Sequence, residues 1–322
     1  MTSLPPKILQ EQIAMGVTLM MLEGALEGDS TNLLKKSLLQ QSTKEPISMP
    51  FTLGLTSGLT NDLPPDVSLP VQSGLTAGLT DSDLLNRFID RALQQAQAQT
   101  PERSYLGASR LGISCSRSLQ YEYTHMPRDT VYSGKTLRIF EMGHALEKMA
   151  RAWLEKAGFE IETHQPDTGE VYGFSAAEGQ LQGHVDGILR KVPEGLEACV
   201  PALWECKSLN AKSWKQLVEK GVKVAKPVYA VQIALYQAYM EESVSGLSKN
   251  PALLTAVNKD TAELYHEWVP FDASLAQAAS DKAVHILRAT RAKETLPRVS
   301  HDPDYFECRF CDWQATCWKG VV

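Results

Sequence analysis

The stretch QLQGHVDGIL at residues 180–189, followed by ALWECKS at residues 202–208, decides the fold of this chain. Each stretch is a short apolar run interrupted by polar residues, and a segment with prolines and a glycine separates the two. This arrangement predicts a β-hairpin. Glu205 and Lys207 are two positions apart on one strand, so both side chains leave the same face. Asp186 on the partner strand can then meet them across the ladder.

The polar residues of this hairpin suit metal-dependent hydrolysis of phosphodiester bonds. The carboxylates of Asp186 and Glu205 are hard oxygen ligands for Mg²⁺ or Mn²⁺, and such an ion activates a bound water. Lys207 can orient that water or offset negative charge in the transition state. An exposed strand that alternates Glu and Lys for solubility is the structural alternative. The apolar neighbours of Glu205 and Lys207 argue against it, and Gly183 and Gly187 bracket Asp186, as expected where another group approaches closely.

A second motif lies downstream, in YAVQIALY at residues 229–236. On a helix, Gln232 and Tyr236 share one face. With the Asp and Glu-x-Lys pattern of the hairpin, this motif resembles the PD-(D/E)XK nuclease superfamily and, within it, the RecB-like exonuclease branch. The resemblance covers roughly residues 104–320. It implies an α/β fold with a restriction-endonuclease-like core, in which helices flank a mixed central sheet. Val185 stands where the family name has proline, a residue that many members lack.

The resemblance also implies roles for individual residues. Asp186 and Glu205 would bind the metal, Lys207 would position the water, and Gln232 and Tyr236 would hold DNA or the metal-bound water.

The same branch begins with a helix whose acidic residue faces the metal. Residues 139–147, IFEMGHALE, are similar to it, and Glu147 is the best match. His144 is either a further metal ligand or a histidine on the helix surface.

The cysteines supply an independent signal. Cys308, Cys311 and Cys317 form a C-x2-C-x5-C run near the end of the sequence, and Cys115 lies far upstream among glycine and serine residues. Four thiolates suit either structural zinc or an iron–sulfur cluster. Cys199 and Cys206 are interpreted as ordinary buried cysteines, and a disulfide framework is not expected in a long chain without a recognisable signal peptide.

One upstream cysteine combined with a C-terminal C-x2-C-x5-C run resembles the iron staple of AddB-type and CRISPR-associated adaptation nucleases. That resemblance implies a structural [4Fe–4S] cluster held by Cys115, Cys308, Cys311 and Cys317, with zinc as the alternative. Closing such a long loop would restrict the unfolded chain.

Composition is ordinary for a soluble, cytoplasmic protein of 322 residues with a formal net charge of −6. No apolar run reaches the roughly 18 residues of a membrane span. The first hundred residues contain six Lys or Arg against ten Asp or Glu, so the acidity is concentrated there.

Between Ser208 and Lys226, five lysines accompany one acid and Trp214. This stretch, which Arg110, Arg117 and Arg128 could extend, is interpreted as a DNA contact, with a solvated helix face as the alternative.

We expect the first hundred residues to form a separate N-terminal extension with helical segments and residues 101–322 to form the nuclease domain, closed by the C-terminal cysteines. The repeat GLTSGLT at 54–60 and GLTAGLT at 74–80 indicates a linker. This extension could also bind a protein partner or a second copy of the chain.

Periodicity predicts the other elements. Helices are expected at about 82–99, 135–157, 210–220, 228–243 and 273–293, and strands at about 159–164, 252–258 and 263–270.

The function that these signals predict is a Mg²⁺- or Mn²⁺-dependent DNA exonuclease. It would act on free, single-stranded DNA ends in recombination, repair or phage-like DNA processing. Two alternatives stay open: a non-catalytic iron–sulfur subunit that binds DNA, and a structure-specific endonuclease on the same core.

Overall fold

A mixed β-sheet carries the hairpin that the sequence predicts. The computed structural model describes residues 80–319, of which residues 88–319 form one compact unit. Within this unit the larger sheet has the strand order β2-β5-β6-β7-β8. The strands are β2 (Glu160–Glu162), β5 (Gly187–Lys191), β6 (Ala202–Leu209), β7 (Ala252–Asn258) and β8 (Leu264–Val269). β6 and β7 pair in parallel, and the other neighbours are antiparallel.

The stretch at residues 180–189 was expected to be a single strand, but it divides between two sheets. Its first part forms β4 (Leu181–His184), which lies between β1 (Leu106–Gly107) and β3 (Gly173–Ala176). Its second part forms β5, so Asp186 lies in the junction. The flanking glycines are needed because other side chains fill the space: a Cβ at Gly183 would lie 2.6 Å from Tyr236, and one at Gly187 would lie 2.6 Å from Ile161.

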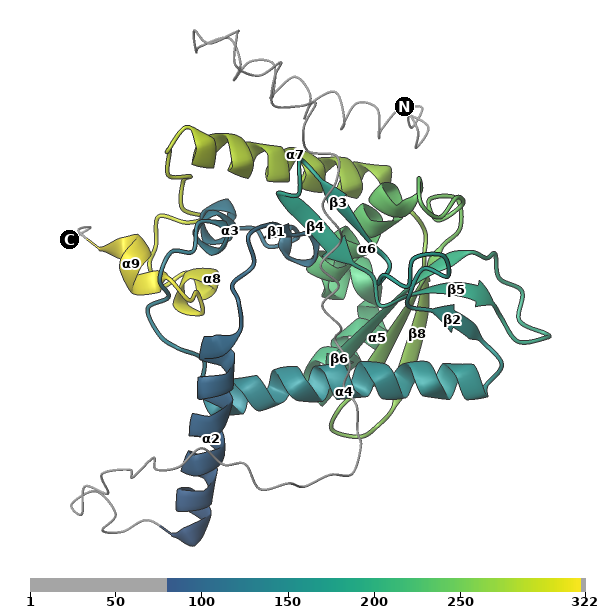
Figure 1. The fold of residues 1–322 in the computed structure, drawn as a ribbon, viewed down its shortest axis with the longest axis horizontal. Coiled ribbons are helices and arrows are strands. Elements are labelled where there is room, and N and C mark those ends of the chain that lie inside the picture. The colour runs from purple at the N-terminus through teal and green to yellow at the C-terminus, as the bar shows by residue number, and fades with distance from the viewer. Residues whose placement is uncertain (1–79, 320–322) are drawn as a thin grey trace, which may run out of the picture. The chain divides into compact units, whose positions relative to one another are not determined.

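Helices cover both faces of the larger sheet (Figure 1). On one face, Ala150 and Leu154 of α4 (Gly134–Lys156) pack in a cluster with Trp204 of β6. On the other face, α5 (Ala211–Ala225) and α6 (Pro227–Met240) form the crossover between β6 and β7, and α7 (Ala273–Arg291) packs against α6. This layering confirms the predicted α/β class with a mixed sheet between helices.

The sequence explains where these helices begin. The side chain of Ser133 accepts a hydrogen bond from the Thr136 backbone before α4, and Asn210 does the same for Ser213 before α5. Asp272 accepts two such bonds before α7. These are the usual residues at a helix N-cap, because their oxygen atoms satisfy amides that the helix leaves unpaired. Pro227 begins α6, where a missing N–H costs nothing.

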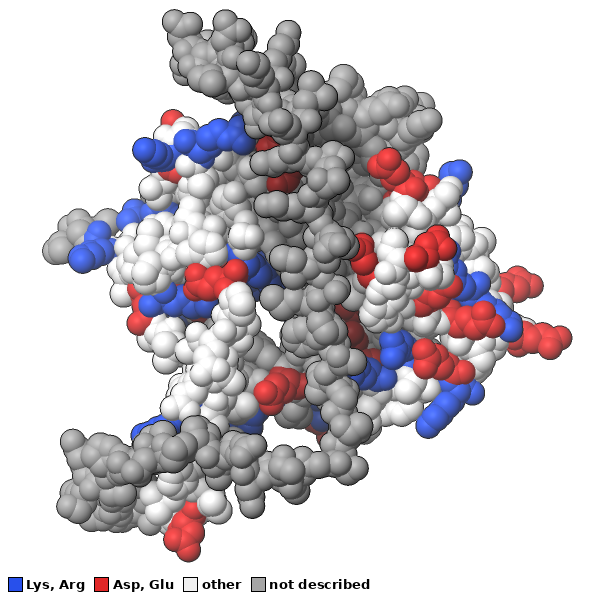
Figure 2. All heavy atoms as spheres, in the orientation of Figure 1, with Lys and Arg blue, Asp and Glu red and all other residues white. Residues whose placement is uncertain are grey.

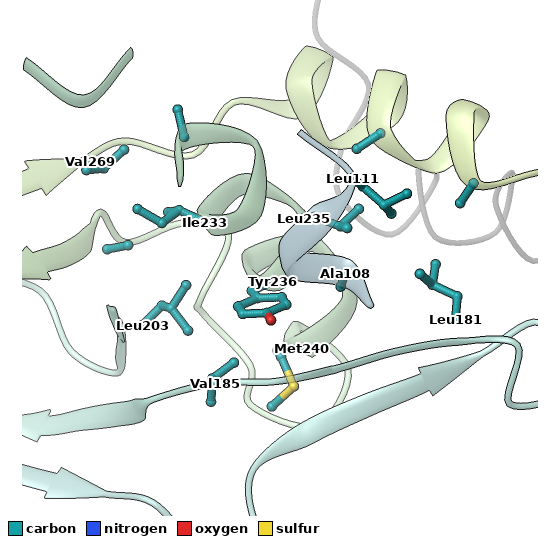
Figure 3. Packing of buried hydrophobic residues seen from close by; sticks show 14 of the residues in the cluster. Ala108, Leu111, Leu181, Val185, Leu203, Ile233, Leu235, Tyr236, Met240 and Val269 are labelled. Atoms are coloured by element: carbon teal, nitrogen blue, oxygen red, sulfur yellow. The ribbon is translucent and has the colours of Figure 1, made fainter. Parts of the chain in front are cut away.

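The main core lies between the larger sheet and α6. Figure 3 shows the Tyr236 ring surrounded by Ala108, Val185 and Met240, with Leu203 of β6 nearby. α6 is apolar around most of its circumference because it lies between the sheet and α7. Every residue of β7 is buried, as expected for a strand with helices on both faces.

Most predicted elements are present with shifted ends. The expected helix at 82–99 is α2 (Asp81–Gln99), and the expected hairpin after residue 250 is formed by β7 and β8. Structure not foreseen from the sequence includes β1, β3, a 3-10 turn η1 (Ala108–Arg110), and α3 (Ser116–Tyr123), together with two short helices, α8 (Phe306–Arg309) and α9 (Gln314–Trp318).

The described residues do not test the predicted domain boundary at residue 100. The predicted linker and partner roles of residues 1–79 also lie outside the described part of the chain. Among residues 80–319, no helix has both the length and the apolar character needed to cross a membrane.

Candidate active site

The hairpin brings Asp186, Glu205 and Lys207 together as the sequence predicts. Asp186 directly precedes β5, whose Gly187 is paired with Trp204 of β6. The Cys206 backbone N–H donates a hydrogen bond of 2.8 Å to Oδ2 of Asp186. The Lys207 ammonium forms an ion pair with Oε1 of Glu205, and the two side chains are 21% and 0% exposed.

The two oxygens of the Glu205 carboxylate have different surroundings. Oε1 accepts hydrogen bonds from Lys207 and from Nε2 of Gln232, which lies 2.6 Å away. Oε2 is buried, and no described residue donates a hydrogen bond to it. Leaving a buried carboxylate oxygen unpaired is costly. This oxygen is therefore available to a cation.

Burial raises the pKa of both carboxyl groups of the hairpin. Burial is the largest effect on Glu205 and the negative charge of Asp186 adds to it, so that its pKa rises to about 8 although Lys207 works against the shift. Burial also raises the pKa of Asp186, against the charges of Lys207 and His144. For Lys207 burial alone would lower the pKa, but Glu205 and Asp186 outweigh burial and raise it. The ammonium form is therefore stable.

α4 brings a third carboxyl group into this environment. Burial, followed by the charge of Asp186, raises the pKa of Glu147 to about 7. His144 is exposed on the same helix, and its electrostatic effect reaches Asp186. Both residues of the predicted helix motif therefore face the region of the hairpin. No described contact distinguishes a ligand role for His144 from a surface role.

These groups share an environment without forming a ready-made ligand set. Among residues 80–319, no three His, Cys, Asp or Glu side chains are close enough together to hold one metal ion. One oxygen of each carboxylate of the hairpin is engaged: Oδ2 of Asp186 by the Cys206 amide, and Oε1 of Glu205 by Lys207 and Gln232. The buried Oε2 of Glu205 and the raised pKa values fit a divalent cation, which would replace the missing positive charge.

Gln232 and Tyr236 lie where the motif predicts, but inside the protein. Gln232 is 5% exposed and Tyr236 is 2% exposed. Gln232 supports the carboxylate of Glu205, and the Tyr236 ring packs edge-on against Phe174 in the core. Direct contact of Tyr236 with DNA does not agree with this burial.

Sequence reasoning missed Tyr229 as part of the site. Its ring lies beside Lys207, with 5.3 Å between Nζ and the ring centroid. The only signal in the sequence was its position three residues before Gln232, one turn earlier on the same helix.

The four cysteines of the predicted staple line one cavity of about 700 Å³. Cys115 is the N-cap residue of α3, Cys308 lies in α8, Cys311 follows it, and Cys317 lies in α9. Burial, followed by the neighbouring Cys115 thiol, raises the pKa of Cys308. The structure thus brings Cys115 to a run of cysteines nearly two hundred positions away. They do not form a metal-ligating group of three or more in the described residues.

Polar contacts hold the walls of this cavity. The Lys282 ammonium donates hydrogen bonds to the carbonyls of Leu111 and Ile113, at 3.0 and 2.8 Å, and so fixes the loop before Cys115. Arg117 donates to Sγ of Cys317 at 3.5 Å. Burial raises the pKa of Cys308 and of Cys311, which favours the thiol form of both in the absence of a metal.

The other two cysteines differ from each other. Cys206 is buried, as predicted, and burial raises the pKa of its thiol. Cys199 is exposed, so its predicted burial is wrong. It lies outside the strands, in the exposed segment that joins β5 to β6.

Only some lysines of the predicted DNA-binding stretch are exposed without an ion-pair partner among the described residues. Lys212 and Lys220 of α5 are exposed, while Lys223 pairs with Asp272 at 2.9 Å. Trp214 packs partly buried against the core, which removes it as an open stacking platform. Figure 2 shows basic and acidic side chains interspersed on the visible described surface.

The three arginines around Cys115 pair with groups of the protein itself, although Arg110 and Arg128 are exposed. Arg110 pairs with Glu122, Arg128 pairs with Asp312, and Arg117 binds Cys317. Arg110, Arg117 and the Arg128 partner Asp312 line the cysteine cavity, so these contacts give no support to the expected extension of a DNA-binding patch.

Comparison with known proteins finds no matching protein-family model and no matching curated sequence. Among solved structures, the chain is similar to an alkaline exonuclease, LHK-Exo, from Laribacter hongkongensis, with a TM-score of 0.41 and 15% identity over 63% of this chain and 93% of that one. For LHK-Exo in complex with dAMP the TM-score is 0.39, with 14% identity over 60% of this chain and 90% of that one. For SSO0001 the TM-score is 0.35, with 16% identity over 73% of this chain and 96% of that one. Similarity at this level does not transfer chemistry, so the assignment of the site rests on the residues of this chain.

Proposed function

We propose that this chain is a Mg²⁺- or Mn²⁺-dependent nuclease that degrades DNA from free ends and prefers single strands. The observation that carries the proposal is the buried Glu205 carboxylate, with Oε1 engaged by Lys207 and Gln232 and Oε2 unpaired among the described residues. A buried carboxylate oxygen without a donor is costly unless another group binds it. A site that leaves one oxygen for a cation beside a second carboxylate suits phosphodiester hydrolysis.

Each residue of the site has a defined role in this proposal. Asp186 and Glu205 would hold the divalent ion, which polarises a phosphate oxygen and lowers the pKa of water when bound. Lys207 orients the attacking water or offsets charge on the phosphate. Gln232 fixes the orientation of Glu205. Glu147 would complete the shell around the ion from α4.

Degradation of end-labelled linear DNA beside a closed circle tests this function. We expect loss of single-stranded linear DNA with Mg²⁺ or Mn²⁺ and none with a chelator. Lys207→Ala should lower the rate by about a hundredfold or more, in the range found when a charge-stabilising group is removed. Lys191→Ala, at an exposed lysine that pairs with Glu160, serves as the matched control.

The outcomes separate the alternatives. Cleavage of the circle would indicate an endonuclease. Equal activity in wild type and Lys207→Ala would place the activity elsewhere. Binding of DNA without degradation, by protein with its cysteine centre intact, would favour a non-catalytic subunit.

We propose in addition that Cys115, Cys308, Cys311 and Cys317 hold a structural [4Fe–4S] cluster. Their common cavity is the supporting observation. Iron and sulfide analysis of protein purified without oxygen, together with its visible absorption, tests this. Stoichiometric zinc without iron would replace the cluster by a zinc site.

A further inference from the structure

The ammonium group of Lys207 has two neighbours of different chemistry. One is the carboxylate of Glu205, and the other is the aromatic face of Tyr229, whose ring centroid lies 5.3 Å from Nζ. A cation within about 6 Å of a ring centroid is attracted by the negative face of the ring. The Lys207 side chain is 21% exposed, so water screens this attraction only in part.

Tyr229 is held in place by its position in the fold. It lies in the first turn of α6, which begins at Pro227, and packs against the main core. Gln232, one turn later on the same helix, binds Glu205. The first turns of α6 therefore contact both members of the ion pair, one through an amide and one through a ring.

The ring matters most when the carboxylate is shared. Under the proposed function, on which this inference rests, Glu205 binds a divalent cation, and its charge is then divided between that cation and Lys207. The ion pair weakens, and the cation repels the ammonium. The aromatic face carries no net charge and its attraction persists.

We propose that Tyr229 is a positioning residue that holds the Lys207 ammonium in the site by a cation–π contact. This role requires the face of the ring and does not require the phenol oxygen.

Fluorinated rings test the proposal, because each fluorine weakens the negative face while the size of the ring changes little. Phenylalanine with an increasing number of fluorine atoms is placed at position 229, with the same series at exposed Phe88 as the control. Tyr229→Phe should stay within about twofold of wild type, and Tyr229→Leu should lose about tenfold in kcat with little change in KM. Along the fluorinated series, kcat should fall stepwise at position 229 and stay constant at position 88.

A second measurement does not depend on activity. Acetylation of Lys207 by acetic anhydride, read by mass spectrometry against Lys191 in the same chain, should become faster with each fluorine. A ring that merely fills space would leave both kcat and the acetylation rate flat along the series, and this result would overturn the proposal.

The two measurements also separate this proposal from the proposed function. If wild type degrades DNA and both series are flat, the role of Tyr229 is wrong and the nuclease assignment stands. If no variant degrades DNA, the nuclease assignment fails, and the acetylation series alone decides whether Tyr229 holds Lys207.

Discussion

The Glu205 side chain has no solvent exposure, although it ends in an ionisable carboxyl group and lies in the middle of a core strand. Its pKa of about 8 means that the folded protein keeps a proton there that the unfolded chain, with an ordinary pKa of 4.5, has already lost. Protonation and folding are therefore linked at this residue.

Linkage predicts the direction in which stability changes with pH. Between pH 4.5 and about 8 the folded state binds the extra proton, so the free energy of unfolding of metal-free protein should fall as pH rises through this interval. Glu205→Gln should flatten the fall, whereas Glu160→Gln at an exposed carboxylate should not. Urea unfolding at a series of pH values measures the slope. An unchanged slope in Glu205→Gln would assign the dependence to other groups.

The same protonation predicts a pH dependence of metal binding. A divalent cation needs the ionised carboxylates, and Glu147 and Glu205 lose their protons at about 7 and about 8. Mn²⁺ affinity should therefore rise with pH, by about tenfold per pH unit for each proton released, and level off above these values. Calorimetric titration of metal-free protein measures it. An affinity that is independent of pH between 6 and 8 is incompatible with these carboxyl groups as ligands.

At the scale of elements, the loop before α3 depends on close contact with α6. A Cβ at Gly112 would lie 2.6 Å from Cα and 2.9 Å from the carbonyl oxygen of Val228, both backbone atoms that cannot turn aside. Val228 directly precedes Tyr229. The loop that carries Cys115 and the helix that carries the site residues are therefore packed backbone to backbone.

Gly112→Ala should consequently destabilise the protein by about 1–3 kcal/mol, as overpacking does. Gly143→Ala is the matched control, because its nearest contact would be an ordinary 3.5 Å and alanine is favoured inside a helix. Thermal unfolding of both variants gives the comparison. Equal midpoints would show that the loop can move away from α6 at no cost.

The sequence predicted those elements whose pattern is local. The nearly continuous apolar run of β7 and the helical periodicity of α7 are present in the residues themselves, and the structure confirms both elements. The division of residues 180–189 between two sheets was missed, because it depends on Tyr236 and Ile161, which lie far away in the chain. The grouping of Asp186, Glu205 and Lys207 was predictable from strand geometry. The contact with Tyr229 was not, since it requires the packing of α6 on the sheet.

At the scale of the whole unit, Lys282 of α7 connects distant segments. Its ammonium satisfies two backbone carbonyls of the loop before Cys115, and burial lowers its pKa. Lys282→Met should leave those carbonyls unpaired, at a cost of about 1–3 kcal/mol, and should speed the alkylation of Cys115 in metal-free protein. Lys249→Met, at an exposed lysine, is the control. Unchanged alkylation of Cys115 would indicate that other contacts are sufficient to hold the loop.

The parallel pairing of β6 with β7 has a consequence for synthesis on the ribosome. The strand that carries Glu205 and Lys207 is bordered by β5 on one side and by a strand made more than forty residues later on the other. A parallel partner of this kind can join only after the intervening crossover has formed. Nascent chains that end before residue 252 should therefore be unable to assemble the site, because β6 then lacks its parallel partner.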